Sequence, residues 1–230
     1  MTHPRLSALA ACTAAAALVA GCATGPSEAE LDRQALAAVQ ASFRAQGVAK
    51  VARIKQDLGQ SACSSDKPPS QAVAERISAE ARASVKWPTG GQYFGDFREG
   101  ERIAQSGRGM TWTDTSTATS ANGGNCYDCH QISRAEISYG TIGPSLLNYG
   151  KNRGVTDLMA PTAQPIVEYT WMKMFNGKTH NACSNMPRFG HAGLPDEKQM
   201  ARLMSLLPDP NSPVNQSLPR DRAGTCDEPE

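Results

Sequence analysis

The chain has 230 residues, of which 40% are hydrophobic, and a formal net charge of +1. This length allows one or two domains with an ordinary hydrophobic core, and the near-neutral charge argues against a nucleic-acid-binding protein. The 20 glycines and 15 prolines predict prominent loops, and the sequence shows neither an internal repeat nor the alternation typical of strands.

The first 21 residues predict an exported protein. An apolar run over residues 6–19 follows Arg5 and ends in small residues, and it is too short for a comfortable membrane span. This is the layout of a secretory signal peptide. The segment Val-Ala-Gly-Cys that ends at Cys22 resembles a bacterial lipobox, in which Cys22 becomes the lipidated first residue; ordinary cleavage that leaves Cys22 a plain thiol is the alternative. Both predict a periplasmic protein, anchored to the membrane if Cys22 is lipidated.

The mature chain is predicted to begin with a tether and a helical extension over residues 22–92, which is not an independent domain. Apolar residues recur every three to four positions from Leu36 to Leu58. They predict an amphipathic helix that begins near Ser27 and is bent or broken near Gly47. Its apolar stripe is expected to pack on the rest of the protein, and a helix lying on the membrane surface is the alternative.

Further helices are predicted along the rest of the chain. The helix after Asp96 contains Gly100, and a glycine inside a helix indicates a close helix–helix approach because it otherwise costs about 1 kcal/mol relative to Ala. The other helices are expected over residues 70–84 and 169–175, and from Asp196 to the residue before Pro208.

Residues 126–130 form the motif Cys-Tyr-Asp-Cys-His, whose spacing is typical of covalent c-type haem attachment. Each thiol can add to one vinyl group of the porphyrin, and the adjacent imidazole of His130 is then carried to the iron. A redox pair, half of a zinc site and a chance match are the alternatives for Cys126 and Cys129. A redox pair usually accompanies a βαβ pattern, and a zinc site needs a second ligand pair.

The remaining cysteines predict one disulfide. Cys12 leaves with the signal peptide, so Cys63, Cys183 and Cys226 are left once the haem and lipid cysteines are assigned. Three cysteines in an oxidising compartment imply one disulfide and one spare thiol. We expect the pair Cys63–Cys183 because Cys226 lies in a polar tail.

Met186 is the expected second axial ligand of the iron. It precedes Pro187 in a loop, and a rigid loop can present a thioether without competing for helix hydrogen bonds. Thioether ligation raises the reduction potential, which suits an electron acceptor. Core packing is the ordinary role of a methionine. The rival ligands are His180, His191, Met172 and Met174.

The order of these segments resembles class I cytochromes c. The shared pattern is a helix, C-x-x-C-H, Gly143-Pro144-Ser145-Leu146, then Met186-Pro187-Arg188-Phe189-Gly190 and a final helix. The resemblance implies a mainly α class I cytochrome c fold with one covalent haem c and an N-terminal helical extension. It also implies that the carbonyl of Pro144 accepts a hydrogen bond from His130. The expected domains are 1–21 signal peptide, 22–92 extension, 93–212 cytochrome c domain and 213–230 polar tail.

The segments around residues 103–110, 124–131, 140–146 and 183–190 are most similar to SoxX, the monohaem subunit of SoxAX cytochromes of bacterial sulfur oxidation. That resemblance implies an electron-transfer subunit of an L-cysteine S-thiosulfotransferase, in a heterodimer with a monohaem or dihaem SoxA. In that family SoxA holds the catalytic haem and joins thiosulfate to a cysteine of the carrier SoxYZ, and a small cytochrome c accepts the electrons. No catalytic residue is expected in this chain.

Two alternatives belong to other functional classes. The first is a free-standing periplasmic cytochrome c shuttle with no catalytic partner. In the second, Cys183 acts as a redox or sulfur-carrying nucleophile near the haem, because it lies only three residues before Met186. Linkage of Cys183 to Cys63 would exclude this second alternative.

Overall fold

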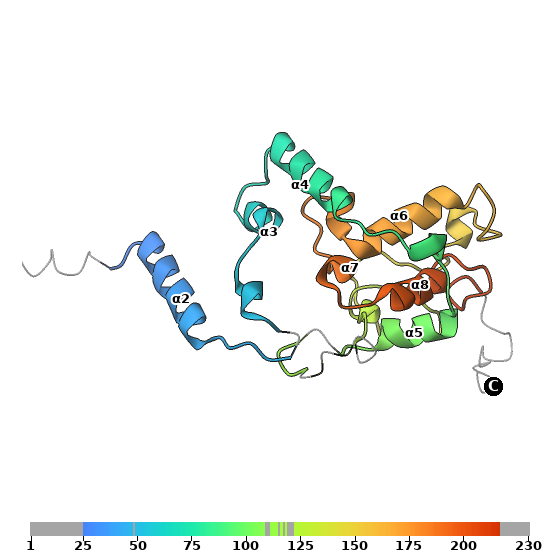
Figure 1. Ribbon diagram of the computed structural model, residues 1–230, viewed down its shortest axis with the longest axis horizontal. Helices are drawn as coiled ribbons and strands as arrows, with labels where there is room; N and C mark the ends of the chain where they lie inside the picture. The colour runs from blue at the N-terminus through green and yellow to red at the C-terminus, as the bar shows by residue number, and fades with distance from the viewer. Residues whose placement is uncertain are drawn as a thin grey trace, which may run out of the picture. The chain divides into compact units, whose positions relative to one another are not determined.

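The computed structural model describes residues 25–47, 49–108, 111–114, 116, 118 and 122–216 (Figure 1). The predictions for the signal peptide, Cys22 and Cys226 lie outside these residues. Within the described ranges the secondary structure is helical, and an isolated bridge between Gln46 and Ala49 is the sole β pairing. The predicted mainly α fold is confirmed. No helix in these ranges combines the length and the apolar character needed to cross a membrane.

The predicted helix to Leu58 is wrong in its extent, since the segment forms three shorter elements. Helix α2 (Glu28–Ser42) begins at the N-cap Ser27, and it is followed by η1 (Val51–Ile54) and α3 (Leu58–Cys63). Between them the chain reverses at Gly47, where φ is 51°, and Gln46 and Ala49 exchange two backbone hydrogen bonds. Helix α2 already ends at Ser42, because Phe43 is extended (φ −72°, ψ 135°), so the apolar spacing overestimated the length of the helix. The predicted break near Gly47 is confirmed.

The chain divides into two compact units, one up to Arg44 and one from Ala45 onward. Helix α2 belongs to the first unit, and none of its residues is buried. The prediction that its apolar stripe packs on the rest of the protein therefore stays a prediction. Residues 45–92, predicted as part of the extension, lie in the same unit as the segment 93–212.

Helix α4 (Gln71–Ala83) attaches the extension to the C-terminal half of that unit. Its buried residues are Ile77 and Ala81. Arg82 donates a hydrogen bond of 2.9 Å to the carbonyl of Thr179, in η6 (Gly177–Thr179). The predicted helix over residues 70–84 is confirmed to within one residue at each end.

Helices α5 (Phe97–Gln105) and α8 (Glu197–Leu206) pack against each other (Figure 1). Asp96 and Asp196 are their N-caps, so both helices begin within one residue of the predicted starts. The two helices approach so closely that a Cβ atom at Gly100 would overlap the carbonyl of Arg202. The expected close approach is therefore confirmed.

Replacement of Gly100 by alanine is expected to destabilise the protein. The new methyl group would meet backbone atoms of α8, which can move aside only if the helix pair separates. Overpacking of this kind typically costs about 1–3 kcal/mol, and here it outweighs the higher helix propensity of alanine. Denaturant unfolding of the wild type and G100A measures the difference. The matched control is Glu99→Ala in the same helix, where the side chain is 41% exposed, and equal stability of G100A and wild type would contradict the packing.

Helix α6 (Gln164–Phe175) supplies the centre of the core. It begins five residues before the predicted start because Pro165 fits the first turn of a helix. Trp171 is 2% exposed, and its indole N–H donates a 2.8 Å hydrogen bond to the carbonyl of Lys86. The remaining short elements are η2 (Thr89–Gly91), η4 (Cys126–Asp128), η5 (Lys151–Arg153) and α7 (Phe189–Ala192).

The packed part of the chain continues beyond residue 212, where the polar tail was expected to begin. Val214 is fully buried, and its carbonyl accepts a hydrogen bond from the backbone of Asn148. The Asn215 side chain accepts from Gly150 and donates to Leu207. One amide side chain thereby satisfies several backbone groups, which holds this end of the chain against the core.

Candidate functional site

A cavity of about 430 Å³ lies in the second unit and has walls from several elements. Helix α8 contributes Leu203 and Leu206, and α6 contributes Met174. All five residues predicted to hold the haem line this one cavity: Cys126, Cys129, His130, Pro144 and Met186. Its size and its mainly apolar walls are typical of a site for a small molecule or cofactor.

A tight turn places both thiols and the imidazole on the same wall. The turn begins at Asn125, whose left-handed backbone (φ 47°, ψ 39°) redirects the chain into η4. The amides of Cys129 and His130 donate hydrogen bonds of 3.2 and 2.9 Å to the carbonyl of Cys126. Because the chain makes a tight turn between them, two thiols separated by two residues both line the cavity.

The orientation of His130 is fixed by the loop that contains Pro144. The carbonyl of Pro144 lies 2.6 Å from the Nδ1 of His130, as the family resemblance implies. Gly143 donates a 2.8 Å backbone hydrogen bond to Cys129, and a Cβ atom at Gly143 would overlap the imidazole. Because Nδ1 is engaged, Nε2 is the nitrogen that can bind a metal.

The surroundings of the two thiols do not resemble those of a redox pair. Burial in apolar surroundings, with Cys129 nearby, raises the pKa of the Cys126 thiol to about 12. Redox-active cysteines instead have lowered pKa values, because the thiolate is the reactive form. For the zinc alternative, the described part of the chain contains no cluster of three or more His, Cys, Asp or Glu side chains that could hold an ion.

Met186 lies in the cavity wall and packs against the hydrophobic core. Its amide donates a 3.3 Å hydrogen bond to the hydroxyl of Ser184. Of the four rivals, Met174 also lines the cavity, whereas His180, His191 and Met172 are not among its lining residues. Met186 and Met174 are therefore the two thioethers that the described residues of this cavity offer to a bound metal.

The cavity also has a cationic part, whose residues are not among the predicted sites. Arg153 and Lys173 belong to its lining, which contains no Asp or Glu among the described residues. The Arg153 guanidinium lies 3.7 Å above the ring of Tyr149, and the Tyr149 hydroxyl is 2.8 Å from that of Thr170. Such a site suits a ligand with carboxylate groups. No spacing in the sequence links residue 153 to residue 173, so only the fold reveals the pair.

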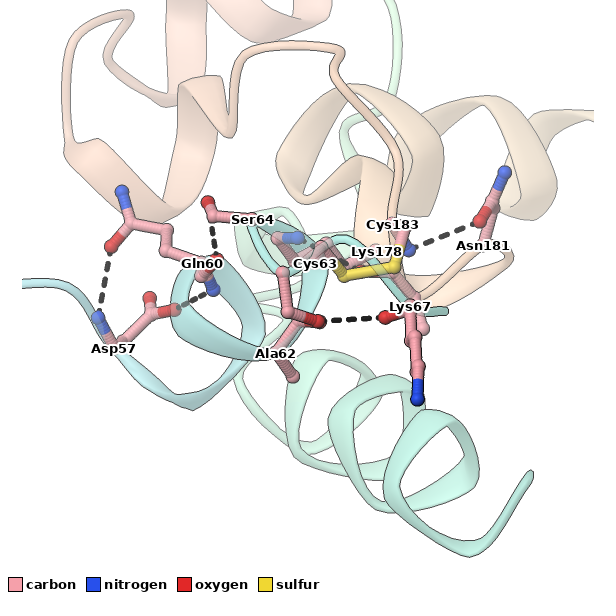
Figure 2. Close-up of a disulfide and its surroundings, with 11 residues drawn as sticks. Asp57, Gln60, Ala62, Cys63, Ser64, Lys67, Lys178, Asn181 and Cys183 are labelled. Atoms are coloured by element: carbon pink, nitrogen blue, oxygen red, sulfur yellow. Dashed lines mark hydrogen bonds between the residues drawn. A yellow bond between two sulfur atoms is a disulfide. The ribbon is translucent and has the colours of Figure 1, made fainter. Parts of the chain in front are cut away.

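A disulfide joins Cys63 of α3 to Cys183, as Figure 2 shows, and the predicted pairing is confirmed. Cys183 also lines the cavity. Since its sulfur is bonded to Cys63, Cys183 is not a free nucleophile, and the hypothesis that it acts as the catalyst is not supported.

A salt bridge accompanies the disulfide. A carboxylate oxygen of Asp57 lies 2.6 Å from the guanidinium of Arg188. Burial opposes ionisation of Asp57, but the hydrogen bond from Gln60 and the bond and charge of Arg188 outweigh it. The pKa of Asp57 is therefore below its ordinary value of 3.8.

This shift predicts a pH dependence of stability. A carboxyl whose pKa is lower in the folded than in the unfolded state stabilises the fold above the unfolded value, and loses that contribution as pH falls through the folded value. We expect the wild type to be more stable than D57N at neutral pH and the difference to shrink below pH 3.8. Denaturant unfolding of both proteins over this range measures it. Lys178 and His191 also interact with Asp57. The quantity compared at each pH is therefore the difference in unfolding free energy between the wild type and D57N. A difference independent of pH would contradict the assignment.

Comparison with known proteins identifies a relative among bacterial lipoproteins. The chain is 34% identical over 165 residues to an uncharacterized lipoprotein of Aquifex aeolicus (strain VF5), a match that covers 70% of this chain and 73% of that protein. No protein-family model matches the chain.

Proposed function

We propose that this chain, which belongs to the family of the Aquifex aeolicus lipoprotein, is an exported, lipid-anchored monohaem cytochrome c that acts as a SoxX-like electron-transfer subunit. In this proposal Cys126 and Cys129 bind the porphyrin through thioether bonds, and His130 and Met186 are the axial ligands of the iron. The anchor would be Cys22, the last residue of the lipobox-like segment.

One observation carries the proposal: all the groups that a c-type haem requires line a single cavity. The two thiols and His130 come from one turn, and Met186 comes from a segment more than fifty residues later in the chain. The remaining walls are mainly apolar, and Arg153 and Lys173 supply positive charge for the two haem propionates. A chance match of the sequence motif gives no reason for this convergence.

The bound haem would supply an iron that cycles between the ferric and ferrous states by one electron. His130 would donate to the iron through Nε2, since Nδ1 is engaged by Pro144. This hydrogen bond makes the imidazole a better donor and fixes its ring plane. The thioether of Met186 would favour the ferrous state and so raise the potential. Apolar walls that exclude water also raise the reduction potential, because they disfavour the additional charge of the ferric iron.

An exposed apolar surface beside the turn favours a partner subunit over a free-standing shuttle. Ile137 is 96% and Ile142 is 80% exposed. Ile142 lines both the cavity and an adjoining hollow, whose lining also includes Cys129 and Tyr139. Two exposed isoleucines five residues apart in one loop are a candidate protein contact. We assign this surface to a SoxA-like haem protein, which would deliver electrons to this chain beside Cys129, and a small cytochrome c would accept them. That partner, and through it a SoxYZ-like carrier, would perform the thiosulfate chemistry.

The test is export of the full chain in a host that attaches haem c, with and without a co-expressed SoxA-like chain. We expect a red protein whose denatured polypeptide retains haem and which co-purifies with the SoxA-like chain. The double variant I137D/Y139D should keep its haem and lose the partner, because Tyr139 lines the adjoining hollow and is not among the residues that line the haem cavity. Met159→Asp is the matched control, because Met159 is also 80% exposed but lines neither cavity. A colourless polypeptide would refute the cytochrome assignment, and a red protein that never binds the partner would favour the free-standing shuttle.

A further inference from the structure

Two contacts from the same N-terminal segment flank Met186. Cys183, three residues before it, is bonded to Cys63, with 120 residues of sequence separation. Arg188, two residues after it, pairs with Asp57 at 2.6 Å. Asp57 and Cys63 are the N-cap and the last residue of the six-residue helix α3, so this one short helix is connected to both sides of the ligand loop.

Helix α3 is itself fixed by several contacts. Asp57 and Gln60 form a reciprocal capping box, drawn in Figure 2. Gly59 is buried against the aliphatic chain of Lys178, and the ammonium of Lys178 donates a 2.8 Å hydrogen bond to the carbonyl of Ala182, the residue before the disulfide. Helix α3 also packs against α4.

The loop between these contacts faces the cavity. Met186 and its neighbours Ser184 and Pro187 all line it. Opening of the loop would withdraw the thioether, and the disulfide and the salt bridge both resist such opening. The salt bridge is partly shielded from water, since the Arg188 side chain is 23% and that of Asp57 is 43% exposed.

We propose that α3 is a clamp that positions Met186 on the haem iron, with Cys63 and Asp57 as its positioning residues. The inference rests on the proposed function, because the clamp has a ligand to position only if the cavity holds haem. It assigns a role to residues 57–63: they keep the sixth coordination position closed to external ligands.

The experiment measures how readily imidazole displaces the thioether in the ferric holoprotein. Imidazole binds only when the loop is open, so its apparent affinity is proportional to the open population. The variants are C63S/C183S, which removes the covalent contact without leaving a lone thiol, and D57N, which removes the charge but keeps an asparagine able to cap α3. The control is E99Q, which removes a partly exposed ion pair with Arg102 in α5.

We expect imidazole affinity to rise by at least about tenfold in C63S/C183S. The rise should be about two- to fivefold in D57N, the range of partly exposed ion pairs, and absent in E99Q. The thioether-to-iron charge-transfer band should disappear at correspondingly lower imidazole concentration. If C63S/C183S fails to fold, the imidazole affinity of D57N alone tests the proposal, since the disulfide and the helix cap are intact in that variant.

The outcomes separate this inference from the proposed function. A chain without haem refutes the proposed function. A holoprotein that lacks the charge-transfer band, or variants that melt earlier yet bind imidazole like the wild type, would overturn the clamp and leave the haem assignment intact. Higher imidazole affinity in both clamp variants but not in E99Q supports it.

Discussion

Replacement of both Cys126 and Cys129 by alanine is expected to yield an exported polypeptide without covalently bound haem. Among the described residues, the other cysteine that lines the cavity is Cys183, which is bonded to Cys63. Its sulfur cannot substitute for a lost haem thiol. The intact mass of the denatured chain and its visible spectrum measure the loss, which should be complete in the double variant. Each single variant should retain one thioether bond and a shifted haem spectrum.

The matched control for this result is C63A/C183A, which also removes two cysteines. It should keep the full haem mass, since neither residue is expected to bind the porphyrin. If the C126A/C129A protein still carried covalent haem, the attachment site would be elsewhere and the electron-transfer proposal would fail with it. If the control lost haem and the double variant did not, the roles of the two cysteine pairs would be reversed.

Replacement of Met186 by alanine is expected to lower the reduction potential and to abolish the thioether charge-transfer band. Loss of the thioether leaves the iron to water or an external ligand, which favours the ferric state. Axial ligands set haem potentials over a range of about 0.8 V, and a fall on the order of 0.1 V is expected for this change. Potentiometric titration of the two holoproteins measures it.

Met174→Leu is the control that decides between the two thioethers of the cavity. Met174 is 6% exposed and belongs to the hydrophobic core. Leucine has a similar volume, so M174L should keep the band, with a stability change of less than about 1.5 kcal/mol. Loss of the band in M174L and its persistence in M186A would transfer the ligand role to Met174.

Local patterns were reliable where a few neighbouring residues decide the structure. The helices predicted after Asp96 and from Asp196 begin there, because a short acceptor side chain before a helix satisfies its free amides. The turn at residues 126–130 is likewise local. Over residues 43–58 the apolar period continues, but the helix ends at Ser42 because Phe43 is extended, and the chain breaks at Gly47 as expected. Periodicity reports which side chains can share a face, and not whether the backbone is continuous.

Residue types and short spacings were enough to predict the mainly α class, the helix starts at Asp96 and Asp196, the close approach at Gly100 and the candidate haem ligands. The packing of the helices was needed to show that Met174 shares the cavity with Met186, whereas His180 and His191 do not line it. It also decided that Arg153 and Lys173 line the same cavity, and that α3 is linked to both sides of the Met186 loop. These are contacts between residues distant in sequence, and such contacts are set by how helices pack, which no local spacing encodes.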